Sequence, residues 1–287
     1  MKPANTRNPD FLVVGAAKAG TTWLQACLGE HPDIFVPGEG ELDFFSLYYD
    51  RGFDWYRSFF DKASKETAVG EKSPSYMVTP EAAGRIYSAL PDAKLIFLFR
   101  NPVERAYSHY CMLARVGAVN KDIDAELRKG TRLVDEGLYF SHLSRFLEYF
   151  DPARVKCMVY EDLKTDARSY VKEIYDFLGV DTTYTPPSLN VKHHAKKNLP
   201  RFVGVNRVMA RTAKKLARSG QAGRTVDRTL RAIGLDSTLR KLNPRDEYPV
   251  MSLKKQQSLA ELYAPDVELL SAWLNRDLYQ LWIARYL

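Results

Sequence analysis

Runs of apolar residues divide this chain into segments that predict a layered α/β fold. Four short runs rich in apolar residues predict strands of a parallel sheet, near 11–15, 68–71, 94–99 and 154–160. Between and after them, apolar residues recur at the spacing of amphipathic helices, near 20–30, 81–90, 102–116, 137–150 and 167–178. Because strands alternate with helices, we expect a doubly wound parallel sheet flanked by helices.

The last hundred residues depart from this alternation. A proline-rich break at 186–190 precedes a basic stretch that predicts one or two helices over 201–235. After it, residues 252–287 predict two C-terminal helices in which Trp273 and Trp282 serve as packing anchors. We therefore expect a single domain over 1–287, which divides into an α/β core (1–185), a basic helical insertion and loop (186–251) and C-terminal helices (252–287).

The loop after the first strand predicts a binding site for a phosphate group. A buried strand, a glycine-bearing loop and a helix start direct backbone N–H groups at one point, and such groups attract anions. A nucleoside-triphosphate P-loop reads G-x-x-x-x-G-K-[ST]. Here Gly15 and Gly20 keep the glycine spacing, Thr21 stands at the lysine position, and Lys18 lies inside the loop. The loop is therefore P-loop-like, but it differs from loops that bind ATP or GTP.

A second predicted strand, 94–99, ends in a cation. A P-loop hydrolase needs an aspartate at such a strand end to hold Mg²⁺, whereas Arg100 offers a guanidinium suited to a phosphate. Parallel strands place their carboxyl ends at one edge of the sheet, so Lys18, Lys72 and Arg100 should gather there. These residues favour an anionic nucleotide that is handled without a metal ion.

Four motifs resemble those of sulfotransferases that use 3′-phosphoadenosine 5′-phosphosulfate (PAPS). The sequences KAGTTWL at 18–24 and LFRNPVERAYSHY at 98–110 look like the two signature loops of that family. The sequences ELDFF at 41–45 and GEKSPSY at 70–76 look closest to the heparan-sulfate-type and related bacterial branch. A weaker similarity continues through YEDL at 160–163. The resemblance implies metal-free, in-line transfer of a sulfuryl group from PAPS to an acceptor, with 3′,5′-bisphosphoadenosine (PAP) as the product.

The resemblance also implies roles for individual residues. In the family the first loop binds the 5′-phosphosulfate, and the arginine and serine of the second loop bind the 3′-phosphate. Trp23 is open to two readings, since it would flank the adenine or belong to the core. Arg245 lies where relatives carry a basic closing loop, although their K-G-R pattern is not reproduced. The expected PAPS-binding residues are Lys18, Ala19, Gly20, Thr21, Thr22, Trp23, Arg100, Ser108 and Arg245.

Three residues are expected to be catalytic: Glu41, Lys18 and Lys72. Glu41 matches the glutamate of the family's E-x-H-F-F element and is the candidate base for the acceptor hydroxyl, although an acidic run at 39–43 is also typical of a solvated surface. Lys18 would stabilise the leaving oxygen, and Lys72 would face the sulfonate and the acceptor. Asp43 stands where the family usually has histidine. It would raise the pKa of Glu41, contact the acceptor or act as the base itself.

The chain is basic, and its charge is concentrated in one segment. The net charge is +7, and the segment 196–245 alone carries about +12, so the rest is mildly acidic. This segment would bind an anionic acceptor, contact a membrane surface through 201–235, or form a solvated face. No nucleic-acid-binding motif accompanies the charge, so a nucleic-acid partner is not expected.

The N-terminal residues and the cysteines predict a cytoplasmic protein. The first ten residues are polar, no run of about 20 apolar residues is present, and the three cysteines form no metal or disulfide pattern. The acceptor is a hydroxyl, or else an amine, of a glycan, a lipid or a small molecule, and the oligomeric state is not indicated. Two other functions stay open: a P-loop-type kinase with an atypical loop, and a nucleotide- or polyanion-binding protein without turnover.

Overall fold

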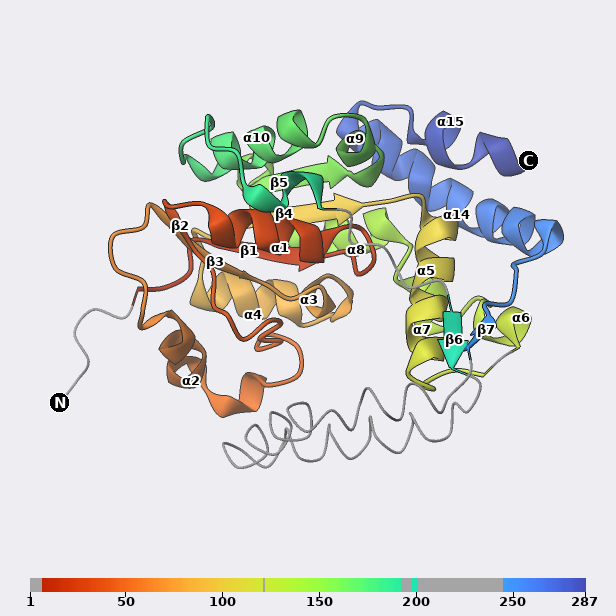
Figure 1. Ribbon diagram of the computed structural model, residues 1–287, viewed down its shortest axis with the longest axis horizontal. Coiled ribbons are helices and arrows are strands. Elements are labelled where there is room, and N and C mark those ends of the chain that lie inside the picture. The colour runs from red at the N-terminus through yellow and green to blue at the C-terminus, as the bar shows by residue number, and fades with distance from the viewer. Residues whose placement is uncertain (1–6, 121, 192–197, 201–244) are drawn as a thin grey trace.

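A five-stranded parallel sheet forms the centre of the molecule. The computed structural model describes residues 7–120, 122–191, 198–200 and 245–287 (Figure 1). The strand order is β2-β3-β1-β4-β5, all parallel. The strands are β1 (Phe11–Gly15), β2 (Ile34–Phe35), β3 (Ala68–Lys72), β4 (Lys94–Phe99) and β5 (Val155–Val159). The four predicted strands and the doubly wound sheet are confirmed. Strand β2 was not predicted, because two residues are too few to show a periodicity.

The register of the sheet brings three strand ends together. Strand β1 lies between β3 and β4, and Val13 of β1 is in register with Lys72 on one side and Ile96 on the other. Every residue of β1 and β3 is buried, as expected for central parallel strands covered on both faces. The loops that follow β1, β3 and β4 therefore start side by side at one edge of the sheet.

Helices cover both faces of the sheet. On one face α1 (Thr21–Glu30) packs near α10 (Ala167–Leu178), and the Tyr175 hydroxyl donates to the carbonyl oxygen of Cys27 at 3.1 Å. On the other face α3 (Ser75–Val78), α4 (Ala82–Ala89) and α8 (Tyr139–Leu147) contact one another (Figure 1). Helix α5 (Pro102–Arg115) stands at the carboxyl edge of the sheet. Helices α1, α4, α5, α8 and α10 confirm the five helices predicted in the α/β core, whereas α3 was not predicted.

Several short helices were not predicted. Their lengths of four to six residues fall below the window in which a helical period is visible. They are α2 (Phe53–Arg57), α3 (Ser75–Val78), α6 (Ile123–Glu126), α7 (Arg132–Asp135) and α9 (Tyr160–Thr165). The 3₁₀ turns are η1 (Tyr49–Arg51), η2 (Ser58–Phe60), η3 (Pro152–Arg154), η4 (Pro187–Asn190) and η5 (Ala284–Tyr286).

The C-terminal residues form the two predicted helices, α14 (Leu253–Leu274) and α15 (Leu278–Trp282). Trp282 is fully buried and Trp273 packs partly buried against the same core, so both act as packing anchors. Helix α14 contacts α5 and α8. Among the described residues, no helix is both long enough and apolar enough to cross a membrane.

A small antiparallel pair lies beside α5. It consists of β6 (Asn198–Pro200) and β7 (Arg245–Glu247), with Pro200 in register with Arg245, and β6 contacts α5. The predicted helices over 201–235 lie outside the described residues, as does most of the basic segment 196–245.

Candidate functional site

The expected site residues lie at the carboxyl edge of the sheet. In Figure 1 the arrowheads of β1, β4 and β5 point towards the side on which α5 stands. Lys18 follows β1, Lys72 ends β3 and Arg100 follows β4. Arg100 Nη1 donates to the carbonyl oxygen of Lys18 at 3.4 Å, so the two signature loops touch. Lys72 in turn pairs with Glu41. The fold thus joins four of the expected residues into two contacting pairs.

The first loop ends at a helix N-terminus that no side chain caps. Gly20 is the N-cap of α1 with φ +98°, and no side-chain hydrogen bond caps this end. A Cβ at this position would lie 3.2 Å from the Tyr160 ring, so a close approach and a left-handed backbone both require glycine. The first N–H groups of a helix have no partner within the helix. These amides therefore form a cradle of the kind that binds phosphate.

The neighbouring side chains of this loop differ in exposure. Ala19 is fully buried, so it offers the site only its backbone. Thr21 is buried and Thr22 is exposed. Trp23 is nearly buried, donates from Nε1 to the carbonyl oxygen of Leu189 at 3.3 Å and packs edge-on against Tyr170. These contacts make Trp23 part of the core between α1, α10 and η4.

Lys18 lies among other cations. It adopts φ +72°, a left-handed conformation that is uncommon for residues other than glycine and that recurs at binding sites. Its Nζ lies 3.7 Å from the sulfur of Met112. Burial, Arg115 and Arg100 lower the pKa of the Lys18 ammonium group. An anion bound beside these cations would relieve their repulsion, so the loop is electrostatically suited to a phosphate or a sulfate.

Arg100 is held in place by three contacts. Its Nη2 donates to Glu104 at 2.9 Å, its guanidinium lies 5.0 Å from the centre of the Tyr160 ring, and Nη1 reaches Lys18. Its Nε is buried with no hydrogen-bond partner in the described structure. The Nε atoms of Arg105 and Arg145 are in the same state, so this atom does not by itself mark a ligand site.

Glu104 connects Arg100 to the end of the chain. Arg285, in η5, contacts Glu104 at 2.6 Å. Burial opposes ionisation, but the hydrogen bonds from Arg100 and Arg285 outweigh it and lower the pKa of Glu104. Ser108 lies one turn beyond Glu104 on α5 and is half-buried. The spacing of four residues places Glu104 and Ser108 on the same face of the helix.

Glu41 and Lys72 form an ion pair. Lys72 Nζ lies 2.6 Å from Glu41 Oε1, and the exposed fraction of the side chain is 5% for the lysine and 49% for the glutamate. The lysine is therefore recessed, while the carboxylate stays open to a second molecule. One side of this carboxylate therefore stays accessible to a second molecule, which is the first condition for proton transfer from that molecule.

The side chain of Asp43, two residues after Glu41, is hydrogen-bonded to Ser75. Ser75 donates to Asp43 Oδ1 at 2.5 Å, and Asp43 has φ +51°. Burial raises the pKa of the Asp43 carboxyl, the Ser75 hydrogen bond opposes this, and the Glu41 charge adds to it. Each carboxylate has one oxygen engaged, but Asp43 is half-buried whereas Glu41 is exposed, so Glu41 is the more accessible of the two.

The structure adds residues that the sequence did not single out. The ring of Tyr160 lies close to both Gly20 and Arg100. Glu104 pairs with Arg100 and also with Arg285. Glu71 is buried and precedes Lys72 in the chain. Only Tyr160 had a signal in the sequence, the YEDL motif. Arg105, which sequence reasoning favoured as a salt-bridge partner, does pair with Glu136 at 3.3 Å. The side chain of Arg245 lies outside what the structure describes.

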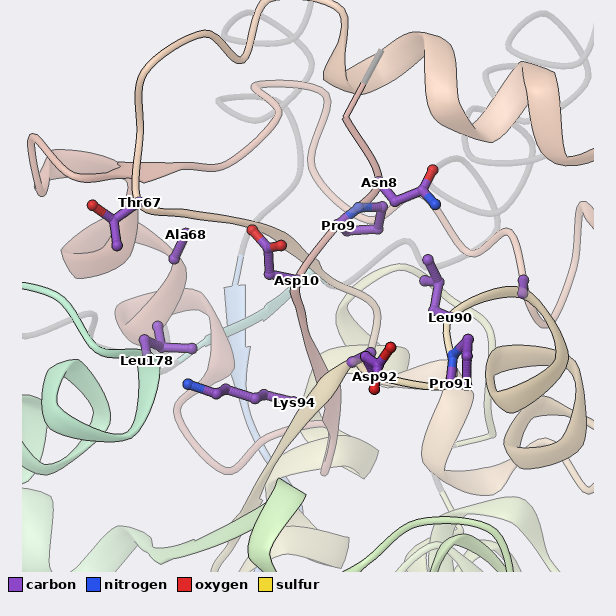
Figure 2. A pocket seen from close by; sticks show the side chains of 12 residues that line it. Asn8, Pro9, Asp10, Thr67, Ala68, Leu90, Pro91, Asp92, Lys94 and Leu178 are labelled. Carbon is purple, nitrogen blue, oxygen red and sulfur yellow. The ribbon is translucent and has the colours of Figure 1, made fainter. Parts of the chain in front are cut away.

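A cavity of about 410 Å³ lies at the opposite, amino edge of the strands. Figure 2 shows Asp10, Leu90 and Lys94 around it, with Lys94 extending towards Leu178. Two charged groups here are already paired, since Lys94 Nζ donates to the carbonyl oxygen of Phe177 at 2.7 Å and Asp10 accepts from the amide of Val69 at 2.8 Å. Across the described residues, no group of three or more His, Cys, Asp and Glu side chains is arranged to hold a metal ion.

Comparison with known proteins identifies the family. The model of the Sulfotransferase domain matches residues 8–225, and the chain therefore belongs to the sulfotransferase family, as its motifs implied. The solved structure of a sulfotransferase from Alicyclobacillus acidocaldarius is similar, with a TM-score of 0.69 and 27% identity over 94% of this chain and 97% of that one.

Curated relatives include heparan sulfate sulfotransferases. The chain is 37% identical over 191 residues to heparan sulfate glucosamine 3-O-sulfotransferase 6 of Mus musculus. The aligned region covers 64% of this chain and 56% of that relative. The chain is 35% identical over 196 residues to the human bifunctional heparan sulfate N-deacetylase/N-sulfotransferase 3, covering 61% of this chain and 22% of the relative. The chain thus spans about half the length of the first relative and less of the second.

Proposed function

We propose that this protein transfers a sulfuryl group from PAPS to a hydroxyl group, or less favourably an amine, of an acceptor. The observation that carries the proposal is the ion pair of Glu41 and Lys72, 2.6 Å apart, at the same sheet edge as the Lys18 loop. This edge combines an anion cradle with a proton acceptor, and sulfuryl transfer to an alcohol needs both.

The described residues fit PAPS. The uncapped start of α1 and Lys18 would hold the 5′ end, while Arg100, which contacts the Lys18 loop, and Ser108 would hold the 3′-phosphate. PAPS supplies the activated sulfuryl group when it is bound. The cations of Lys18, Arg100 and Lys72 supply the positive charge that a metal ion supplies in P-loop hydrolases, so we propose that no metal is required.

The residues of the chain then divide the work of the reaction. The free oxygen of Glu41 accepts the proton of the acceptor hydroxyl, which makes the hydroxyl oxygen nucleophilic. Lys72 orients Glu41 and places a positive charge beside the reacting groups. Lys18 stabilises the negative charge that develops on the departing oxygen.

We propose an anionic glycan as the acceptor, with PAP as the second product. The relatives named for heparan sulfate support this choice, and the net charge of +7 favours an anionic partner. A lipid headgroup and a small molecule are the alternatives. Membrane contact through 201–235 and a cytoplasmic location stay predictions, which vesicle co-sedimentation and cell fractionation test.

The proposal is tested in two steps. We expect PAP to raise the melting temperature of the protein, and ³⁵S-labelled PAPS to label a heparan-sulfate-type glycan equally well with and without EDTA. Labelling of a lipid or small-molecule extract instead would replace the acceptor. Phosphate transfer that requires ATP and Mg²⁺ would indicate a kinase, and PAP binding without transfer to any extract would indicate a binding protein.

A further inference from the structure

Glu71 is a buried carboxyl group directly behind the proposed catalytic pair. It precedes Lys72 in β3 and points to the opposite face of the strand, since side chains alternate along a strand. It is 0% exposed. Buried carboxyl groups are rare unless they are hydrogen-bonded, so the hydrogen-bond partners of Glu71 indicate its role in the structure.

Three hydroxyl groups donate to Glu71. Ser73 Oγ donates to Glu71 Oε2 at 2.7 Å, Tyr56 Oη lies 3.4 Å from Glu71 Oε1, and the Tyr76 hydroxyl also forms a hydrogen bond with the carboxyl group. A hydroxyl has one hydrogen to donate and lone pairs that accept. When these hydroxyl hydrogens are donated to Glu71 in hydrogen bonds, the hydroxyl oxygens can still accept hydrogen bonds from other groups.

Two of these hydroxyl oxygens hold the loop that carries Glu41. The backbone N–H of Asp43 donates to Ser73 Oγ at 2.9 Å, and the N–H of Phe44 donates to the Tyr76 hydroxyl at 2.9 Å. Tyr56 makes no such contact with this loop, because its hydroxyl donates to Glu71 alone among the hydrogen bonds described. The loop is therefore tied to the end of β3 two residues after Glu41.

We propose that Glu71 is a positioning residue: through Ser73 and Tyr76 it fixes the 41–45 loop so that the Glu41 carboxylate meets Lys72. The two amides held by the hydroxyls and the 2.6 Å ion pair tie the 41–44 segment to residues 71–73 and 76, and the Ser75 hydroxyl adds a hydrogen bond to Asp43 Oδ1 at 2.5 Å. If the ties are lost, the loop moves and the base leaves its place beside Lys72. This proposal rests on the proposed function, since it assigns Glu41 to the base.

Two tyrosines of the cluster provide a matched test. Tyr56 and Tyr76 are both fully buried and both bond to Glu71, but only Tyr76 holds a loop amide. Tyr76→Phe should lower kcat about tenfold, because it leaves the Phe44 N–H without its acceptor. The PAP dissociation constant should not change. Tyr56→Phe should leave kcat within about twofold of wild type, since the loop keeps both ties.

Amide hydrogen exchange reads the same contacts without requiring activity. In Tyr76→Phe the amide of Phe44 should exchange about tenfold faster, and in Ser73→Ala the amide of Asp43 should do so, while amides of β1 keep their protection. Ser73→Ala also serves if Tyr76→Phe folds poorly, as judged by the PAP-induced shift in melting temperature.

The outcomes separate this inference from the proposed function. Equal kcat values for Tyr56→Phe and Tyr76→Phe, with unchanged exchange at residues 43 and 44, would overturn the positioning role even if the wild type transfers sulfate. A wild type that transfers no sulfate, but whose loop amides respond as expected, would overturn the catalytic assignment and leave the tie between β3 and the loop intact.

Discussion

The two halves of the site handle charge in opposite ways. In the phosphate half, which comprises residues 18–22 with Arg100 and Ser108, Glu104 pairs with Arg100 at 2.9 Å, but the nearby charges of Arg115 and Arg100 still help to lower the pKa of Lys18. In the base half, which comprises Glu41 and Lys72, the cation is already neutralised by a carboxylate 2.6 Å away. The first half is suited to receive an anion, whereas the second is balanced before any ligand arrives.

This difference indicates where binding energy and where chemistry reside. An excess of positive charge in a site favours the bound state of an anion over the anion free in solution. A neutral pair binds little by charge, but it holds a proton acceptor in a defined direction. Variants of the phosphate half should therefore change ligand affinity, and variants of the base half should change turnover.

The largest effect is expected in the base half. Glu41→Gln should lower kcat by about 10²–10⁴-fold, the usual contribution of a general base, with PAP affinity unchanged. The measurement is ³⁵S transfer at saturating PAPS, with Glu39→Gln as the control, since Glu39 is an exposed neighbour in the same acidic run. Turnover of Glu41→Gln within about tenfold of wild type would remove Glu41 from the role.

Lys18→Met should affect both turnover and affinity. Loss of a charge that faces the departing oxygen should reduce kcat by about 10²–10³-fold, and PAP should bind more weakly because one cation of the cradle is gone. Steady-state kinetics and calorimetry measure the two effects. Lys62→Met is the matched control, because Lys62 is exposed in the segment between η2 and β3. A loss confined to kcat, with PAP affinity intact, would move Lys18 out of the phosphate half.

Arg100→Ala should act mainly on binding. Loss of a charge-assisted contact to the 3′-phosphate should weaken PAP about 10–100-fold. Adenosine 5′-phosphosulfate, which lacks the 3′ group, should be affected much less, and Ser108→Ala should weaken PAP about fivefold, as expected for a neutral hydroxyl. Calorimetric titration of both ligands makes the comparison. Equal losses for the two ligands would show that Arg100 does not recognise the 3′-phosphate.

The smallest effect concerns stability. Burial raises the pKa of Glu71 from 4.5 to about 7, against the hydrogen bonds from Ser73, Tyr76 and Tyr56, and the Asp43 charge adds to the rise. The folded protein thus retains a proton that the unfolded chain has already lost. This stabilisation is complete below pH 4.5 and is lost as the pH rises through about 7.

Between pH 6 and pH 8, this group should therefore lower the free energy of unfolding of the wild type by about 1 kcal/mol. Glu71→Gln has no such proton to lose, so its pH dependence should be flatter by that amount, and Glu39→Gln should follow the wild type. Urea unfolding at three pH values measures the slopes. Parallel slopes for wild type and Glu71→Gln would show that the Glu71 carboxyl does not titrate in this range.

The phosphate half was largely readable from the sequence. Gly15, Lys18, Gly20 and the strand before them lie within one short segment, so local pattern specified a strand, a loop and a helix start. The rule that parallel strand ends share an edge then placed Arg100 near Lys18, and a hydrogen bond of 3.4 Å joins them in the structure. The contacts that secure Arg100 were not readable, because Arg285 lies 181 residues from Glu104 along the chain.

The chain's own pattern of apolar runs and motifs was enough to predict the doubly wound sheet, which the structure confirms, and to propose an anion cradle after β1 and the residues for sulfuryl transfer. Those features depend on residues that are neighbours in the chain. Only the folded structure decided that Lys72 is recessed while Glu41 stays open, and that Ser73 and Tyr76 grip the loop between them. Those contacts join positions about thirty residues apart in the chain. Burial determines which of the charged groups is exposed to water, and the order of residues along the chain does not specify burial.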